Sequence, residues 1–268
     1  MGILPLTTMQ PGEEVLYPFA YEECLCQLVG DGRLSGPLLH IWRHPRAFVL
    51  GLRDRRLPRA REAMDWLRQQ GFSVMVRHSG GAAVPLDLGV VNLTLIQASD
   101  GRHVSMHDDF RRMVSWLQTS LQPWGVALTA GEVAGSYCPG EFDLSVNGRK
   151  CCGLAQRRQQ RSVAVQAFVN AEGDAQERAE WAREFYARAG GDGPAAQASG
   201  AQEGAAASAL VVEAGVMASL SECYPGGFPG AEAWIETLFT THPKIAAPPI
   251  PRAAVDEMVA TLRTRYNP

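Results

Sequence analysis

Hydrophobic residues recur every three to four positions in several segments of the chain, which is the periodicity of an amphipathic helix. The segment 57–71 also carries boundary signals, with Pro58 in its first turn and Gly71 after its last periodic residue. A proline-rich connector at 241–252 separates two further helical patterns. The helices predicted before that connector lie at 13–29, 57–71, 108–125 and 177–190.

Between these helices, short apolar runs bounded by turn residues predict β-strands. Residues 38–44 and 47–51 are predicted to form a hairpin, and residues 82–97 two strands around a turn at 87–89. A further strand is predicted at 72–77. Strands and helices are interleaved, but hairpins dominate, which favours an α+β fold over a doubly wound parallel sheet.

The dipeptide Asn147-Gly148 lies between two alternating runs and predicts a tight hairpin, because both turn positions require a positive φ. Directly opposed residues of such a hairpin share one face of the sheet. Lys150 and Asp143 are thereby placed on one face, while Leu144 lies on the apolar face. The predicted pairs are Val146 with Arg149, Ser145 with Lys150, Leu144 with Cys151 and Asp143 with Cys152.

Composition and charge place the chain among ordinary globular proteins. Of its 268 residues, 46% are hydrophobic and 20% are charged, and the net charge is −3. Nothing in this balance indicates nucleic acid, and no apolar stretch approaches the roughly 18 residues of a membrane span. The first residues lack the basic and apolar regions of a signal peptide. We therefore expect a cytoplasmic protein that binds neither nucleic acid nor membranes.

The expected organisation is a single domain over residues 1–268 with one interruption. Residues 191–208 consist mainly of alanine and glycine. Such a segment has too little apolar surface to order itself, so it is predicted to be a mobile loop within the domain.

The six cysteines do not form a recognisable disulfide or metal pattern. They lie at positions 24, 26, 138, 151, 152 and 223, and none belongs to a C-x-x-C pair. The six histidines show no spacing that would partner them with these cysteines in a zinc site. We therefore expect free thiols, a reducing compartment and no metal site.

Cys138 lies in the segment Gly135–Gly140, where Pro139 and Gly140 disfavour any regular element. The segment directly precedes the hairpin that carries Lys150. A cation close to a cysteine lowers the pKa of the thiol, and the thiolate is the nucleophile of acyl transfer through a thioester. Cys138 and Lys150 are accordingly candidates for a catalytic pair. The alternative is a partly buried structural cysteine beside a solvated strand lysine.

A second candidate feature is the glycine pair that follows the strand at 72–77. Gly80 and Gly81 let the backbone approach a ligand closely and leave N–H groups free to bind a carbonyl oxygen. The same residues are also compatible with a simple turn.

A cationic turn joins the two strands predicted on either side of residues 157–161. Its arginines are Arg157, Arg158 and Arg161. They form either a solvated basic face or a docking surface for an acidic partner.

Three segments of the chain resemble one protein family. Residues 77–96, RHSGGAAVPLDLGVVNLTLI, resemble the R-x-S-G-G-x-A-V-x-x-D-x-G-x-x-N segment of the biotin and lipoate protein ligase/transferase superfamily. Residues 142–158, FDLSVNGRKCCGLAQRR, resemble its lysine-bearing hairpin, D-L-x-x-x-G-x-K-x-x-G-x-x-Q. The loop GSYCPG at 135–140 narrows the resemblance to the cysteine-dependent octanoyltransferases of lipoate assembly, which include the lipoyl amidotransferases.

The resemblance implies a catalytic domain with a mixed, largely antiparallel sheet flanked by helices. It implies that Cys138 forms an acyl-thioester and that Lys150 lowers the pKa of this cysteine. The implied reaction moves an octanoyl or lipoyl group from the glycine cleavage H protein to a lysine of the lipoyl domains of 2-oxoacid dehydrogenase E2 subunits, without a cofactor. The residues implied to line the acyl pocket and polarise the carbonyl are Arg77, Ser79, Gly80, Gly81 and Ala82.

Two departures from the ATP-dependent ligases of the superfamily bear on the reaction. Those enzymes usually have a third glycine and a His-Asp pair in the first segment, where this chain has Ala82 and Leu86-Asp87. They also lack the cysteine of the S-Y-C-P-G loop, so both differences argue against ATP as a substrate. The alternatives that stay open are an octanoyl-acyl-carrier-protein transferase with the same Cys-Lys pair, an ATP-dependent lipoate ligase, and a non-catalytic module that binds lipoyl domains.

Overall fold

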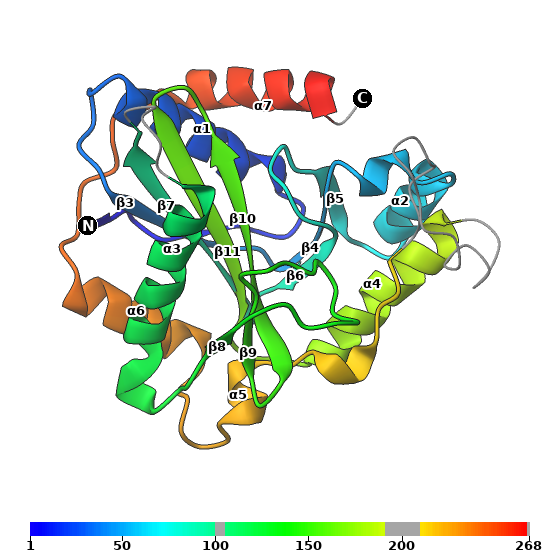
Figure 1. The fold of residues 1–268 in the computed structure, drawn as a ribbon. Coiled ribbons are helices and arrows are strands. Elements are labelled where there is room, and N and C mark those ends of the chain that lie inside the picture. Colours follow the sequence, from blue (N-terminus) through cyan, green and yellow to red (C-terminus); the bar gives the residue numbers. More distant parts are fainter. Residues whose placement is uncertain (100–104, 191–209, 267–268) are drawn as a thin grey trace.

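The computed structural model of the protein describes residues 1–99, 105–190 and 210–266. Its strands form two sheets, and helices lie against both (Figure 1). The segment 191–208, predicted to be a mobile loop, lies outside the described residues.

The larger sheet has eight strands, and its long central strands are antiparallel. β7 (Val90–Ala98), β11 (Ser162–Asn170) and β10 (Arg149–Arg158) lie side by side in its middle. β3 (Leu38–Arg43) pairs with β7 on one side, and β9 (Leu144–Val146) pairs with β10 on the other. The short outer strands, of which the first two run parallel to β3, are β1 (Gly2–Ile3), β2 (Thr7–Thr8) and β8 (Thr129–Ala130).

The smaller sheet has three strands in the order β5-β4-β6. β4 (Arg46–Leu50) lies in the middle, parallel to β5 (Ser73–Val76) and antiparallel to β6 (Val84–Asp87). The glycine-rich segment 77–82 lies between β5 and β6. Both ends of this segment are therefore fixed by strands of the smaller sheet.

Helices cover both faces of the larger sheet (Figure 1). α1 (Leu16–Gly30) lies against β7 and β11, and α7 (Arg252–Tyr266) packs on α1. On the opposite face, α3 (Met106–Leu121) and α6 (Ala231–Thr241) share a hydrophobic cluster with the inward side chains of β7 and β11. The larger sheet is therefore the middle layer of three.

The smaller sheet has its own cover of helices (Figure 1). α2 (Ala60–Gln69) contacts β5, and α4 (Ala175–Ala189) contacts β6 and α2. The short helix α5 (Leu220–Cys223) has a complete capping box at Ser219, which stabilises a helix of one turn.

This architecture confirms the predicted α+β fold with a mixed, largely antiparallel sheet flanked by helices. The predicted hairpin of residues 38–44 and 47–51 is wrong, because β3 belongs to the larger sheet and β4 to the smaller one. The two strands predicted at 82–97 are likewise divided between the sheets. Every residue of β3 is buried, and so is every residue of β4 except Arg46. A strand that is buried on both faces has no alternation to indicate its partner.

The Asn147-Gly148 hairpin has the predicted turn, with φ of 51° at Asn147 and 77° at Gly148. The pairs nearest the turn are those predicted, Val146 with Arg149 and Ser145 with Lys150. The next predicted pair is wrong, because a β-bulge beyond Lys150 places Leu144 opposite Cys152. Both faces of the hairpin are buried, so Lys150 is a core residue and not a solvated strand lysine.

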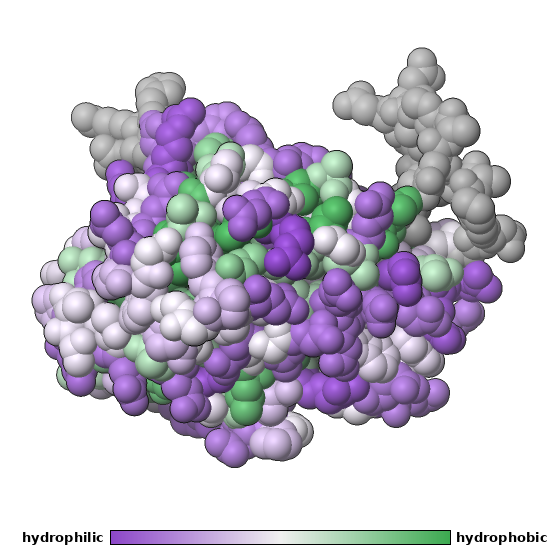
Figure 2. All heavy atoms as spheres, turned by 90° about the horizontal axis from the view of Figure 1, so that it is seen from below, coloured by the Kyte–Doolittle hydropathy of each residue, from purple (hydrophilic) through white to green (hydrophobic). Residues whose placement is uncertain are grey.

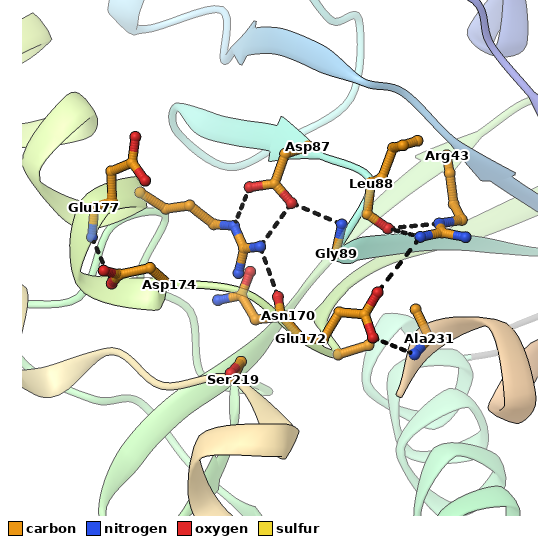
Figure 3. Close-up of polar contacts among 12 residues, drawn as sticks. Arg43, Asp87, Leu88, Gly89, Asn170, Glu172, Asp174, Glu177, Ser219 and Ala231 are labelled. Carbon is orange, nitrogen blue, oxygen red and sulfur yellow. Dashed lines mark hydrogen bonds and ion pairs between the residues drawn. The ribbon is translucent and has the colours of Figure 1, made fainter. Parts of the chain in front are cut away.

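A buried arginine ties α4 to the turn between the two sheets (Figure 3). Arg178 of α4 donates two hydrogen bonds of 2.6 Å to the carboxylate of Asp87, at the end of β6, and one to the carbonyl oxygen of Glu172. A Cβ atom at Gly89 would lie 2.3 Å from that carbonyl oxygen. These contacts hold the turn at which the chain leaves the smaller sheet for the larger one.

Replacing Asp87 with alanine is expected to lower the free energy of unfolding by about 2 kcal/mol, because Arg178 would keep a buried charge without its carboxylate. Urea unfolding of both proteins measures the change. The control is Asp65→Ala, which removes the exposed partner of Arg68 and should cost less than about 0.5 kcal/mol. Equal losses in the two variants would contradict the role given to Arg178.

The face of the molecule seen in Figure 2 is mostly hydrophilic, and its hydrophobic residues form small separate patches. No helix in the described ranges is long and apolar enough to cross a lipid bilayer. The large hydrophobic side chains exposed in those ranges are dispersed along the chain at Leu6, Leu88, Met106 and Val211.

Candidate active site

Cys138 lies on the loop from β8 to β9, in a backbone conformation that is unusual for a residue with a side chain. Its φ is 49°, in the left-handed region, and the residue is only 5% exposed. Nζ of Lys150 donates hydrogen bonds to the carbonyl oxygen of Tyr137, at 2.9 Å, and to that of Cys138. The ring of Tyr137 stacks on Phe168, and its hydroxyl is hydrogen bonded to Asn170. The loop is thus anchored to β10 and β11.

The sulfur of Cys138 has two hydrogen-bond donors from the glycine-rich segment. Nη2 of Arg77 lies 3.4 Å from Sγ, and the backbone N–H of Ala82 lies 3.3 Å from it. The guanidinium is itself held by the carbonyl oxygens of Gly80 and Ala82, each at 2.8 Å. A cation and a backbone N–H that converge on a sulfur stabilise its thiolate form.

Gly81 is a point of close approach between this segment and the cysteine. Its φ is +88°, and a Cβ atom there would lie 2.3 Å from Nη2 of Arg77 and 2.9 Å from Sγ of Cys138. A Cβ atom at Gly80 would meet nothing within 4 Å. Of the two glycines singled out in the sequence, Gly81 is therefore the one that the packing requires.

Lys150 is fully buried, and its ammonium group has a third partner in the carboxylate of Asp143, at 2.8 Å. Burial raises the pKa of Asp143 to about 6, although the adjacent ammonium acts in the opposite direction. Together with two loop carbonyls, Asp143 occupies all three protons that an ammonium can donate. The cation that is hydrogen bonded to Sγ is Arg77, whereas Lys150 binds the backbone of the loop that carries Sγ.

A narrow apolar slot opens beside Cys138, with a volume of about 40 Å³. Cys138 and Arg77 are part of its lining. A slot of this size next to a thiol has room for the first methylene groups of an unbranched chain, whose burial is favourable. Its apolar walls come from α1 and both sheets, and include Phe19, Trp42, Val49, Val84, Leu86, Leu154 and Phe168.

A larger and more polar basin, of about 740 Å³, adjoins the same segment. Residues Ser79–Ala82 line this basin, and so does Pro139, the residue directly after the cysteine. Cys138 therefore lies between a narrow apolar slot and a wider, more polar basin. Of the site residues expected from the sequence, Cys138 and Arg77 line the slot and Ser79–Ala82 line the basin. Lys150 lines neither and binds the backbone of the loop that carries Cys138.

His78 is a residue of the basin that the sequence did not single out. Its Nε2 lies 2.8 Å from Oε1 of Glu23, and its ring is flanked by the rings of Phe19 and Tyr266. Burial opposes ionisation of Glu23, but hydrogen bonds from His78 and Arg157 outweigh it and lower the pKa of Glu23 to about 2. The two members of the pair are 55 residues apart, so no local spacing could reveal them.

The lowered pKa of Glu23 predicts a contribution to stability that is lost in acid. The pKa falls from 4.5 to about 2 on folding, so the contribution is complete above pH 4.5 and disappears as the pH falls towards about 2. A shift of this size corresponds to about 3 kcal/mol. The difference in unfolding free energy between the native protein and Glu23→Gln should therefore shrink across this range. A difference that is independent of pH would contradict the prediction, and Glu180→Gln, on the exposed face of α4, controls for the substitution itself.

The arginines of the turn between β10 and β11 each pair with a carboxylate of the same chain. Their charges are therefore compensated within the protein, which leaves less positive potential for an acidic partner than the sequence suggests. The pairs are Arg157 with Glu23, Arg158 with Asp109 and Arg161 with Asp31.

The remaining cysteines are less suited to nucleophilic chemistry. Burial raises the pKa of the Cys26, Cys151 and Cys152 thiols above the ordinary value, and a neutral thiol is a poor nucleophile. In the described ranges, no group of three or more His, Cys, Asp or Glu side chains is placed to hold a metal ion.

The fold is that of a lipoate-protein ligase catalytic domain. It superposes on lipoate-protein ligase A bound with ATP with a TM-score of 0.67 at 19% identity, over 98% of this chain and 94% of that one. A putative lipoate protein ligase of T. acidophilum, Ta0514, with bound lipoic acid gives a TM-score of 0.64 at 18% identity, over 98% and 95%. At these identities the likeness concerns the fold.

Residues 14–196 match the lipoyl protein ligase A/B catalytic domain, and the chain belongs to this family. The octanoyl-[GcvH]:protein N-octanoyltransferase of Anoxybacillus flavithermus is 39% identical over 186 residues, 69% of this chain and 66% of that protein. The enzyme of the same name from Geobacillus kaustophilus is 41% identical over 168 residues, 63% and 59%. The lipoyl-[GcvH]:protein N-lipoyltransferase of Listeria monocytogenes is 35% identical over 184 residues, 69% and 66%. The matched part of the chain thus spans between 59% and 66% of the length of these relatives.

Proposed function

We propose that the protein transfers an octanoyl group from a lysine of one protein to a lysine of another through a thioester on Cys138. The observation that carries the proposal is the position of Sγ, which is hydrogen bonded to the Arg77 guanidinium and the Ala82 N–H beside a narrow apolar slot. A cysteine sulfur held by a cation and a backbone N–H beside an apolar slot is the arrangement that a thioester-forming acyltransferase needs.

The reaction has two halves that use the same groups. In the first, the sulfur of Cys138 gives up its proton as it attacks the carbonyl carbon of the donor's acyl-lysine, the carbon–nitrogen bond breaks, and the lysine amine leaves in protonated form. In the second, the acceptor's lysine amine attacks the thioester, the carbon–sulfur bond breaks, and the departing sulfur takes up a proton from the nitrogen. Arg77 and the Ala82 N–H stabilise the negative charge that develops at the sulfur when the carbon–sulfur bond forms and when it breaks. Lys150 keeps the loop in the conformation that presents Sγ to the slot.

The partners that fit this reaction are the glycine cleavage H protein as donor and the lipoyl domains of 2-oxoacid dehydrogenase E2 subunits as acceptors. Support for the donor comes from the relatives, whose names give GcvH as the protein that carries the acyl group. An acyl-lysine side chain is long and thin, which suits entry through the basin to a residue that is only 5% exposed. Octanoyl and lipoyl groups both occur in the names of the relatives, and in both the carbons next to the carbonyl form an unbranched chain.

Incubation with octanoylated H protein, followed by intact-mass and peptide analysis, tests the proposal. We expect one octanoyl group on the peptide that contains Cys138, removable by hydroxylamine as a thioester is. An adduct on Cys151, Cys152 or a lysine would overturn the assignment. Loading of Cys138 from octanoyl-acyl carrier protein but not from H protein would show that the donor is the acyl carrier protein. Transfer that depends on ATP and survives Cys138→Ala would make the protein a ligase.

A further inference from the structure

His78 lines the basin, and one of its two ring nitrogens has a hydrogen-bond partner while the other is buried without one among the described residues. Nε2 is within 2.8 Å of the Glu23 carboxylate, while Nδ1 is buried and has no hydrogen-bond partner among the described residues. The residue is 6% exposed, and it lines the basin together with Ser79–Ala82. When the Nε2–H donates to Glu23, Nδ1 keeps its lone pair. A carboxylate that orients an imidazole in this way leaves the other ring nitrogen as the position that accepts a proton.

We propose that His78 is the general base that accepts a proton from the acceptor's lysine ammonium, and the general acid that returns a proton to the donor's departing lysine amine. This role rests on the proposed acyl transfer. It assigns the group that accepts a proton from the acceptor's lysine and returns a proton to the donor's lysine. A lysine side chain is protonated at neutral pH and has no lone pair with which to attack. A transferase that uses lysine as a nucleophile therefore needs a base close to the point at which the lysine meets the thioester.

The protons of the second half-reaction balance with His78 and Cys138 alone. The acceptor's ammonium must lose two protons to become an amide nitrogen. The first passes to Nδ1 of His78, which frees the lone pair for attack on the thioester carbonyl. The carbon–nitrogen bond forms, the carbon–sulfur bond breaks, and the departing sulfur of Cys138 takes the second proton. In the first half-reaction, the thiol and the imidazolium return the same two protons to the donor's amine.

Three charged groups near the site are less suited to this task. The ammonium of Lys150 has all three protons engaged by acceptors. The guanidinium of Arg77 does not give up its proton in proteins. Glu23 is a positioning residue, since its carboxylate is held by hydrogen bonds from His78, Arg157 and Gln159 and so fixes the imidazole ring.

The test separates attack by an ammonium from attack by a nucleophile that needs no base. Native protein and His78→Gln are loaded with the octanoyl thioester of N-acetylcysteamine, whose thiol leaves without help from an acid. Each acyl-enzyme is then mixed with an unmodified lipoyl domain or with hydroxylamine, which is unprotonated at neutral pH. We expect transfer to the lipoyl domain to fall by about 100-fold or more in His78→Gln, while release by hydroxylamine changes little. Glu23→Gln should show the same pattern more weakly.

His107→Gln is the matched control, because His107 is exposed on α3 and pairs with Glu141 at the surface. It should behave as the native protein does with both nucleophiles. Undiminished transfer to the lipoyl domain in His78→Gln would overturn the role of His78 and leave the thioester mechanism standing. Equal loss with both nucleophiles would overturn it too, because the damage would then lie at the thioester. Failure of the native protein to form any adduct on Cys138 would instead refute the proposed function.

Discussion

Replacing Cys138 with alanine is expected to reduce octanoyl transfer by at least about 10⁴-fold, because the thioester can no longer form. The free energy of unfolding should change little. Alanine removes one sulfur atom, and Lys150 continues to hold the loop through backbone carbonyl oxygens. Transfer is measured by the mass of an unmodified lipoyl domain incubated with octanoylated H protein, and stability by urea unfolding.

The matched control for this substitution is Cys223→Ala, which removes a half-buried free thiol that is hydrogen bonded to Arg149. It should leave transfer unchanged. A Cys138→Ala protein with native transfer rates would contradict the thioester mechanism. A Cys138→Ala protein that is inactive because it is unfolded would contradict the expectation that the loop is held by its backbone.

Replacing Lys150 with methionine is expected to lower the free energy of unfolding by about 3 kcal/mol and to slow transfer strongly. Lys150 is fully buried, and its ammonium serves two loop carbonyls and the Asp143 carboxylate. Methionine fills a similar volume but takes the ammonium donor from these three acceptors and leaves Asp143 only the N–H of Gly140, which is more costly than removing both partners. Urea unfolding and the lipoyl-domain transfer assay measure the two effects.

Two further variants separate the causes of this loss. Lys150→Met combined with Asp143→Leu should regain part of the stability, because no unpaired carboxylate stays buried. Lys244→Met, at an exposed position, controls for the loss of a lysine. Arg77→Met should slow alkylation of Cys138 by iodoacetamide more than Lys150→Met does, since Arg77 is the cation bonded to Sγ. The opposite order would assign to Lys150 the thiolate-stabilising role that the family resemblance implies.

Sequence by itself determined the features of this protein that depend on neighbours along the chain. The helical periodicity and end signals of 57–71 correspond to α2, and the Asn147-Gly148 turn has both positive φ values. The Pro139-Gly140 pair placed Cys138 on a loop, as the structure does. Local φ/ψ preferences and side-chain periodicity act within about one turn of chain, so a single sequence is enough to read them.

Only the tertiary structure decided which strands pair and which groups surround the sulfur. β3 and β4 are adjacent in the chain yet lie in different sheets, because both are buried and nothing in their pattern selects a partner. Arg77 contacts Sγ of Cys138 although the two residues are 61 positions apart in the chain. His78 contacts Glu23 across a separation of 55 positions. Such contacts require alignment to within a few tenths of an ångström. That alignment comes from the packing of α1 and the two sheets around one slot, and it is a property of the assembled core that no local segment contains.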